Sequence, residues 1–247
     1  MTPRADRHLR ASYGIDAPAF LPIAGLVLAA NLVVAVWTHA RGPMIGAAVI
    51  LVCIGFFLHT TRRGKFLAWR DVLDGLELRG DERILDVGCG RGAVLLAAAR
   101  RLPTGRAVGI DIWSRRDQSG NAANAARRNS AAEGVEECVS LATADMMALP
   151  FRAASFDVIL SSIAIHNISG LAGRLRAVEE AARVLSPGGR LVLADIRSTG
   201  DYARRLQSLG MVEVKQHGLG WRMWWGGPWA PTRLVTATKP PGGAGLP

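Results

Sequence analysis

"RILDVGCGRGAVLLAAARRLPTGRAVGID", residues 83–111, is the stretch that decides the fold. It reads as an apolar strand, a glycine-rich turn, an apolar helix and a second apolar strand, over 83–88, 88–92, 93–102 and 106–111. Two apolar strands joined by a helix predict a parallel βαβ unit. The glycines permit a tight turn with close backbone approach to a ligand, and the free N–H groups that begin the next helix suit an anion. Asp111 ends the second strand 23 residues after Gly88, where a carboxylate suits a ribose diol. The spacing therefore predicts a site for a nucleoside-bearing ligand.

The same alternation of strands and helices continues to the end of the chain. Further strands are expected at 139–145, 156–162 and 190–196, with helices at 119–134, 171–185 and 201–210. The segments 212–218 and 232–239 look like a terminal antiparallel pair. This pattern predicts an α/β fold with a mostly parallel sheet.

Five stretches in order make the prediction more specific. They are "ILDVGCGRG" (84–92), "VGIDIW" (108–113), "ATADMMALPF" (142–151), "FDVILSSIAIHNI" (156–168) and "RVLSPGGRLVLADI" (183–196). Together they resemble the consecutive motifs of class I methyltransferases that use S-adenosylmethionine (SAM), especially the quinone-biosynthesis (UbiE-like) and related small-molecule enzymes. The resemblance covers about residues 65–239 and implies a Rossmann-like, seven-stranded fold. The glycine-rich turn departs from the dinucleotide pattern G-x-G-x-x-G, because residue 93 is alanine.

The resemblance implies a role for each motif residue. The methionine part of SAM would contact Asp86 and the backbone of Gly88, Cys89, Gly90 and Gly92. The ribose would contact Asp111, and the adenine would contact Ile112, Trp113, Asp145 and Met146. The reacting centre would be lined by Ser161 and Ser162. Gln118, in the basic loop 113–121, is a further candidate for cofactor contact. Asp86 and Asp145 also suit a turn cap and a helix cap, and the loop also reads as merely basic.

His166 and Asn167 are the candidate catalytic residues. They follow the fourth strand, near the place where the methyl group is expected. The pKa that histidine ordinarily has suits a general base near neutrality, and Asn167 could orient the ring or bind substrate. A histidine that only satisfies a loop backbone is the competing interpretation.

Two apolar runs precede this domain. Residues 19–37 and 42–58 contain no charged side chain, and each is long enough as a helix to cross most of a ~30 Å hydrocarbon core. The short connection predicts an antiparallel membrane hairpin, and the small pairs Gly25/Ala29 and Gly42/Gly46 predict close helix contact. A buried hairpin in a soluble domain and a cleaved signal peptide are the alternatives.

Positive charges flank the hairpin on one side. Arg4, Arg7 and Arg10 precede it, and Arg62, Arg63, Lys65 and Arg70 follow it, whereas the connecting loop has only Arg41. Positive charge marks the cytoplasmic side, so both termini and the catalytic domain are expected there. Lys65 to Leu76 then reads as an amphipathic helix whose apolar stripe covers the next domain. The expected organisation is a basic segment (1–18), a transmembrane hairpin (19–60), a linker helix (61–80), a methyltransferase domain (81–239) and a flexible tail (240–247).

Tryptophan is concentrated in "GWRMWWGGPW", residues 220–229. The segment joins the last two expected strands. Trp221, Trp224 and Trp225 are expected to contact substrate, the lipid headgroup layer or both, because amphipathic aromatic rings favour membrane interfaces. Ordinary packing on the sheet is the alternative.

The sequence thus predicts a membrane-anchored, SAM-dependent methyltransferase acting on a lipophilic small molecule such as a quinone or lipid. The alternatives are a nicotinamide-dependent oxidoreductase and a non-catalytic SAM-binding membrane adaptor. Net charge is +10, but the basic residues are scattered and a D/N-P-P-aromatic motif is absent, so no nucleic-acid partner is expected. The three cysteines have no CxxC or Cys/His spacing, so no metal site is expected.

Overall fold

The structure is a computed structural model that describes residues 11–242. Arg4, Arg7 and Arg10 of the predicted basic segment lie outside the described residues, as does the part of the predicted tail from 243 to 247.

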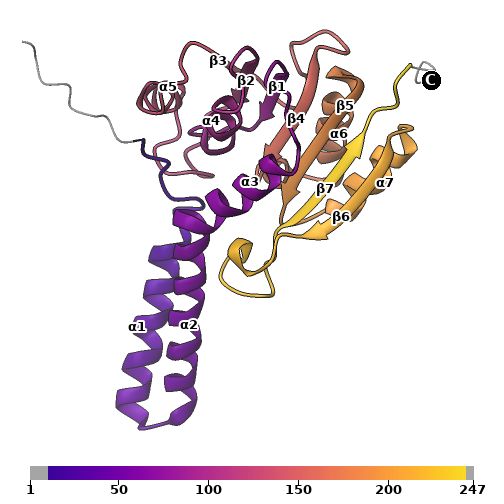
Figure 1. The fold of residues 1–247 in the computed structure, drawn as a ribbon. Coiled ribbons are helices and arrows are strands. Elements are labelled where there is room, and N and C mark those ends of the chain that lie inside the picture. The colour runs from indigo at the N-terminus through magenta and orange to yellow at the C-terminus, as the bar shows by residue number, and fades with distance from the viewer. Residues whose placement is uncertain (1–10, 243–247) are drawn as a thin grey trace, which may run out of the picture.

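One sheet of seven strands forms the centre of the domain, in the order β3-β2-β1-β4-β5-β7-β6 (Figure 1). The strands are β1 (Arg83–Val87), β2 (Arg106–Asp111), β3 (Val139–Thr143), β4 (Phe156–Ser162), β5 (Leu185–Asp195), β6 (Val212–Gly218) and β7 (Arg233–Thr238). Neighbouring strands are parallel except where β7 pairs with β5 and β6. The predicted α/β class, the mostly parallel sheet and the terminal antiparallel pair are confirmed.

Helices cover both faces of the sheet because successive strand side chains point to opposite faces. Ile84 packs into a buried cluster with α3 (Lys65–Asp74) and α4 (Ala93–Ala99). Leu85, the next residue, packs into a second cluster with α6 (Leu171–Val184) and α7 (Thr199–Ser208). α5 (Ala123–Ala132) contacts β3. Trp69 and Leu73 of the predicted amphipathic stripe are buried, so the stripe covers the domain as expected.

The expected start of the fifth strand at residue 190 is wrong. β5 begins at Leu185, directly after α6, and runs through "SPGG". Leu185 pairs with Phe156, and the register then shifts before Arg190 pairs with Val158. The glycines that suggested a turn therefore occupy an irregular part of the strand.

α1 (Phe20–Thr38) and α2 (Arg41–His59) stand out from the domain as a two-helix arm (Figure 1). Both helices are long and apolar enough to cross a membrane. Leu26, Val33 and Val36 are 72%, 66% and 73% exposed, so the arm is not the buried hairpin of a soluble core. Of the small residues expected at the helix contact, Gly46 faces Asn31, whereas Gly25 and Gly42 have no close neighbour. The contact prediction was therefore wrong for Gly25 and Gly42.

The second helix of the arm continues into the domain. A π-helical turn, η1 (Thr60–Gly64), joins α2 to α3, and such turns are frequent at functional sites. Gly64 is required here, because a side chain would overlap the backbone oxygen of Arg222. The η1 turn thus lets the segment between β6 and β7 lie against the base of the arm.

The base of the arm lies at the carboxyl edge of the parallel strands. Asp195, at the end of β5, pairs with Arg233, at the start of β7, so the segment 219–232 lies at that edge. Thr60 Oγ1 in η1 donates a hydrogen bond of 2.8 Å to Trp224 O in the same segment. In open α/β sheets this edge is where ligands bind.

Candidate functional site

Acidic side chains converge at the carboxyl edge of the sheet. Asp86 lies near the end of β1, and Asp111 and Asp195 are the last residues of β2 and β5. Asp145 follows β3 by two residues. Parallel strands that end side by side explain how residues far apart in sequence reach one site.

Asp86 is a buried carboxylate without a hydrogen-bond partner among residues 11–242. It is 1% exposed, and neither of its oxygens accepts a hydrogen bond from the described residues. Burial raises the pKa of Asp86 to about 7. The Leu95 amide lowers this pKa, although it does not reach hydrogen-bond geometry, and the negative charge of Asp111 raises it further. A buried carboxylate is normally paired, so Asp86 suits a positively charged ligand group.

The glycine-rich turn brings backbone close to this carboxylate. Gly88 has φ +76°, and a side chain there would overlap Ala164 Cβ. Gly90 has φ +52°, and a Cβ atom would lie 2.7 Å from Gln118 Oε1. Both positions therefore require glycine. Cys89 contributes only its backbone, because its side chain is 7% exposed and faces the core.

Asp111 organises the turn as well as the end of β2. One oxygen accepts a hydrogen bond from Gly90 N at 2.8 Å, and the other accepts from Trp113 N at 2.5 Å and Asn121 Nδ2 at 3.2 Å. Burial raises its pKa, although these three donors partly offset the effect. The carboxylate retains acceptor positions that suit the hydroxyls of a ribose.

The residues after Asp111 form one side of the site. Trp113 has φ +62°, and its indole N–H donates to Thr143 Oγ1 at 2.8 Å, which fixes the ring over the ends of β2 and β3. Ile112 is 63% exposed, which suits contact with a ligand ring. Gln118 Oε1 accepts from Arg91 N at 2.9 Å, so this loop is tied to the glycine-rich turn.

Asp145 and Met146 begin the loop after β3. Asp145 is exposed and accepts from Met147 N at 2.8 Å, which closes a turn. The helix-cap alternative is wrong, because no helix begins between β3 and β4. Met146 lies beside Gly88, since a Cβ there would come within 3.2 Å of its Cε. Met146 therefore lies at the glycine-rich turn. A contact between Asp145 and adenine stays a prediction.

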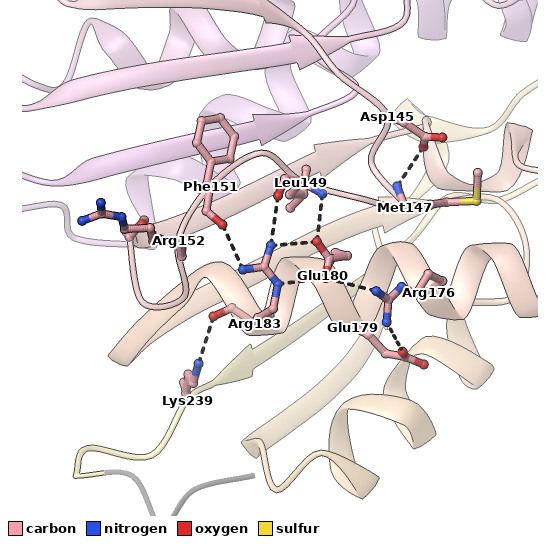
Figure 2. Close-up of polar contacts among 11 residues, drawn as sticks. Asp145, Met147, Leu149, Phe151, Arg152, Arg176, Glu179, Glu180, Arg183 and Lys239 are labelled. Carbon is pink, nitrogen blue, oxygen red and sulfur yellow. Dashed lines mark hydrogen bonds and ion pairs between the residues drawn. The ribbon is translucent and has the colours of Figure 1, made fainter. Parts of the chain in front are cut away.

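Figure 2 shows what holds this loop in place from the side of α6. Glu180, which is buried, accepts from Leu149 N at 2.8 Å. Arg183 donates to Phe151 O, to Leu149 O and to Glu180 itself. The arginine pairing holds the pKa of Glu180 below its usual range. The buried carboxylate of Glu180 and the partly exposed guanidinium of Arg183 together hold backbone groups of Leu149 and Phe151, so these two residues position the site without contacting it.

The two serines at the end of β4 have separate surroundings. Ser161 is 1% exposed and donates to Val87 O at 2.8 Å, so its hydroxyl links β4 to β1. Ser162 accepts from the indole N–H of Trp69 at 2.8 Å. Trp69 lies on α3, so the helix that continues the arm reaches the carboxyl end of β4.

His166 forms a close pair with Asp195. It lies in the short helix η2 (Ile165–Asn167), and its backbone N donates to Asp195 Oδ2 at 2.9 Å. Its ring Nδ1 lies 2.7 Å from Asp195 Oδ1, which is within ion-pair distance. The angle at the ring N–H is not that of a hydrogen bond, because the oxygen lies to one side of the N–H direction. Asp195 also accepts from Tyr202 Oη at 3.3 Å, and burial raises the pKa of that phenol. A buried carboxylate behind a histidine suits stabilisation of a protonated ring.

The expectation that Asn167 orients His166 is wrong. Asn167 is exposed, and Asp195 from the neighbouring strand is the group beside the imidazole. Among residues 11–242, no hydrogen bond engages His166 Nε2, so this atom is the one that can meet a substrate. A substrate contact by Asn167 stays a prediction.

The tryptophan-rich segment packs on the base of the arm. Trp224 lies 5.6 Å from the ring of Phe56, Trp225 lies 5.9 Å from Phe57, and Trp221 stacks on His59 at 4.7 Å. Trp221 and Trp229 remain 53% and 67% exposed. Trp224 and Trp225 therefore attach the segment to α2, while the exposed indoles are the ones that can meet lipid or substrate.

Sequence reasoning missed Asp195, Trp69, Glu180 and Arg183. Asp195 had a usable signal, since it ends an apolar strand just as Asp111 does. Glu180 and Arg183 are three residues apart on a helix, a spacing equally common on a solvated surface. Trp69 was recognised only as part of an apolar stripe.

Comparisons with known proteins agree with this geometry. Residues 85–193 match the family described as "Methyltransferase domain". The chain is 34% identical over 128 residues to the ubiquinone/menaquinone biosynthesis C-methyltransferase UbiE of Ruegeria sp. (strain TM1040), which covers 51% of this chain and 48% of the relative. It is 33% identical over 131 residues to the demethylmenaquinone methyltransferase of Symbiobacterium thermophilum, which covers 52% and 49%. The chain thus spans about half the length of the curated relatives it matches.

A solved structure shows the same fold. Geranyl diphosphate methyltransferase in complex with SAM superposes with a TM-score of 0.59 at 16% identity, covering 76% of this chain and 88% of that one. At this identity the likeness concerns the fold alone.

Proposed function

We propose that the chain transfers a methyl group from SAM to a lipophilic small molecule at a membrane surface, because residues 85–193 match the methyltransferase-domain family and lie in a sheet with the class I strand order. One observation carries the proposal: the edge that bears Asp86, Asp111 and His166 also bears the base of an exposed apolar helical arm. A cofactor site alone would fit any methyltransferase. The position of this site beside the base of the apolar arm favours an acceptor that partitions into lipid.

The residues at the carboxyl edge fit SAM. The ammonium group of its methionine part and its sulfonium carry positive charge, which the buried carboxylate of Asp86 would balance. The amides from Gly88 to Gly92 would bind its carboxylate, and Asp111 would bind the ribose hydroxyls. When bound, SAM supplies an electrophilic methyl group on a positively charged sulfur.

The chain contributes alignment, exclusion of water and a base. We assign the base to His166, whose Nε2 removes a proton from an acceptor hydroxyl. The electron pair left on the acceptor, on oxygen or on a conjugated carbon, would form the new bond to the methyl group that bound SAM supplies, while the methyl–sulfur bond breaks and the sulfur leaves as a neutral thioether. Asp195 stabilises the imidazolium that forms, because its carboxylate lies 2.7 Å from Nδ1.

A quinone-like acceptor fits the arm and the chemistry. A quinol is lipophilic, carries a hydroxyl that a histidine can deprotonate, and has conjugated carbons. One relative is described as a ubiquinone/menaquinone biosynthesis C-methyltransferase and another as a demethylmenaquinone methyltransferase, which supports this class. With both ends of the arm at the domain, the positive residues Arg62 and Arg63 would place the domain in the cytoplasm.

Incubation with methyl-labelled SAM and a membrane extract tests the proposal. Label is expected in an organic-soluble product, which mass spectrometry then identifies. Label only in water-soluble products would contradict a lipophilic acceptor. Retention of SAM with no labelled product would indicate a binding adaptor, and binding of NAD(P)H without SAM would indicate an oxidoreductase.

The affinity for SAM is expected to depend on pH through Asp86. Because its pKa is about 7 and a cationic ligand binds the ionised form, affinity should rise about 5- to 10-fold from about pH 6 to pH 7.5. Stability of the ligand-free protein changes in the opposite sense: a raised pKa means that the contribution of Asp86 is lost as the pH rises through about 7. Calorimetric titration should show the rise in wild type and a flat profile in Asp86→Asn. A rise of equal size in the variant would exclude Asp86 as its source.

The exposed indoles of Trp221 and Trp229 are expected to help the protein bind a membrane-embedded methyl acceptor. Replacing Trp221 and Trp229 together with alanine should raise the KM for an acceptor embedded in vesicles about 3- to 10-fold, because apolar contact area is lost. The Kd for SAM should not change. Trp37→Ala is the matched control, since Trp37 is 89% exposed at the far end of the arm. An equal effect of the control variant would refute a specific role for the tryptophan-rich segment.

A further inference from the structure

The chain enters and leaves the arm at one polar junction. Asp16 lies just before α1 and accepts hydrogen bonds from two residues that follow α2: Thr61 Oγ1 at 2.7 Å and Lys65 Nζ at 2.6 Å. The side chains of Lys65 and Asp16 are only 9% and 18% exposed. Solvent screens the attraction in an ion pair this sheltered only weakly, and such a pair requires good geometry. The junction therefore fixes how the arm meets the domain.

The same carboxylate reaches the cofactor site. Asp16 Oδ1 accepts from Gln118 Nε2 at 3.1 Å, and Gln118 Oε1 accepts from Arg91 N at 2.9 Å. Arg91 lies between Gly90 and Gly92 in the glycine-rich turn. A continuous chain of hydrogen bonds therefore runs from the base of the arm, through Asp16 and Gln118, to the backbone expected to bind SAM.

Asp16 decides which way the amide of Gln118 points. The carboxylate is only an acceptor, so it selects the –NH2 end of the amide and leaves the oxygen for Arg91 N. Without Asp16 the amide is free to rotate and turn its –NH2 end toward Arg91 N, a donor from which it cannot accept a hydrogen bond. The turn would then lose the acceptor that holds the Arg91 amide.

The backbone beside Asp16 strengthens the connection. Ser119 N donates to Ile15 O at 2.9 Å, and Ala17 N donates to Asp117 O at 2.9 Å. Asn129 donates both to Ser12 O at 3.0 Å and to Arg91 O at 2.8 Å. Residues 12–17 therefore lie across the loop that carries Gln118, and both backbone groups of Arg91 are held by residues that contact this segment or its neighbours.

We propose that Asp16 is a positioning residue for the cofactor site, which acts through Gln118 and links the base of the arm to the affinity for SAM. The inference rests on the proposed function for the identity of the cofactor. The two fail differently: wild type that binds no SAM contradicts the proposed function, whereas wild type that binds SAM no better than Asp16→Ala contradicts this inference.

Full-length protein in lipid nanodiscs provides the test. Asp16→Ala should raise the Kd for SAM about 5- to 20-fold, the loss expected for a charged hydrogen-bond network. The KM for SAM should rise in parallel while kcat stays near wild type. Without SAM, amide hydrogen exchange in residues 88–95 should become faster, which is a readout independent of activity. Asp201→Ala is the matched control, because it removes a partly exposed carboxylate paired with Arg204 on α7.

A double-mutant cycle separates positioning from general destabilisation. If Asp16 acts through Gln118, Asp16→Ala with Gln118→Ala should bind SAM no worse than Gln118→Ala alone. Additive losses would overturn the inference, as would unchanged exchange in residues 88–95. Asp16→Asn keeps an acceptor for Gln118 and loses the ion pair with Lys65, so it should restore most of the affinity. A folded Asp16→Asn protein that binds as weakly as Asp16→Ala would also overturn it.

Discussion

His166→Ala is expected to lower kcat for methyl transfer by about 10²- to 10⁴-fold, the range that a positioned general base contributes. The Kd for SAM should stay within about twofold, because the side chain of His166 pairs with Asp195, which is not among the residues assigned to the cofactor. The physical basis is the pair with Asp195, whose buried carboxylate lies 2.7 Å from Nδ1 and leaves Nε2 as the ring nitrogen available to a substrate. Single-turnover kinetics with labelled SAM measure the chemical step directly.

Asp195→Asn is the companion variant for this prediction. It preserves the size of the side chain and removes the charge that stabilises a protonated imidazole. A smaller loss of kcat than in His166→Ala is expected, and the two losses should not add when combined. A parallel loss of SAM affinity in both variants would show that the pair supports the fold and does not act in catalysis.

Asp111→Ala is expected to weaken SAM binding by about 100-fold or more. The carboxylate would accept two ribose hydroxyls, and each hydrogen bond to a charged group contributes about 1.5–3 kcal/mol. It also holds the amides of Gly90 and Trp113, so its removal loosens the glycine-rich turn. Calorimetric titration measures the Kd.

Asp157→Ala provides the matched control for Asp111→Ala. Asp157, near the start of β4, accepts from the backbone N of Arg83, the first residue of β1, at a solvent-exposed contact away from the carboxyl edge. Its loss should leave SAM affinity unchanged. A Kd for Asp111→Ala within about threefold of wild type would mean that Asp111 does not bind the ribose.

The parts of this protein that were predictable from sequence are those set by local pattern. The glycine-rich turn and Asp111 stand out because turn chemistry and a charge at the end of an apolar strand are local signals. β5 was misjudged because glycine and proline in "SPGG" usually indicate a turn, yet pairing of Leu185 with Phe156 extends the strand. The tertiary partner outweighed the local preference.

The parts that were not predictable depend on contacts between distant segments. Asp16 reaches Thr61, Lys65 and Gln118 across large sequence separations, and nothing in "GIDAPA" distinguishes that aspartate from a surface residue. The same holds for Trp69 and Ser162, whose contact exists only because α3 continues the arm across the domain. Asp195 is different: its signal was present and equal to that of Asp111, but the resemblance assigned it no role.

The position of the catalytic edge against the base of the arm is the central claim, and vesicles test it most directly. Full-length protein is reconstituted into vesicles that contain lipids from a membrane extract, and protein-free vesicles with the same lipids are added. After a short incubation with methyl-labelled SAM, the two populations are separated and their lipids counted, with His166→Ala as the blank. The account predicts label in the lipids of the protein-bearing vesicles alone. Equal labelling of both populations would contradict it.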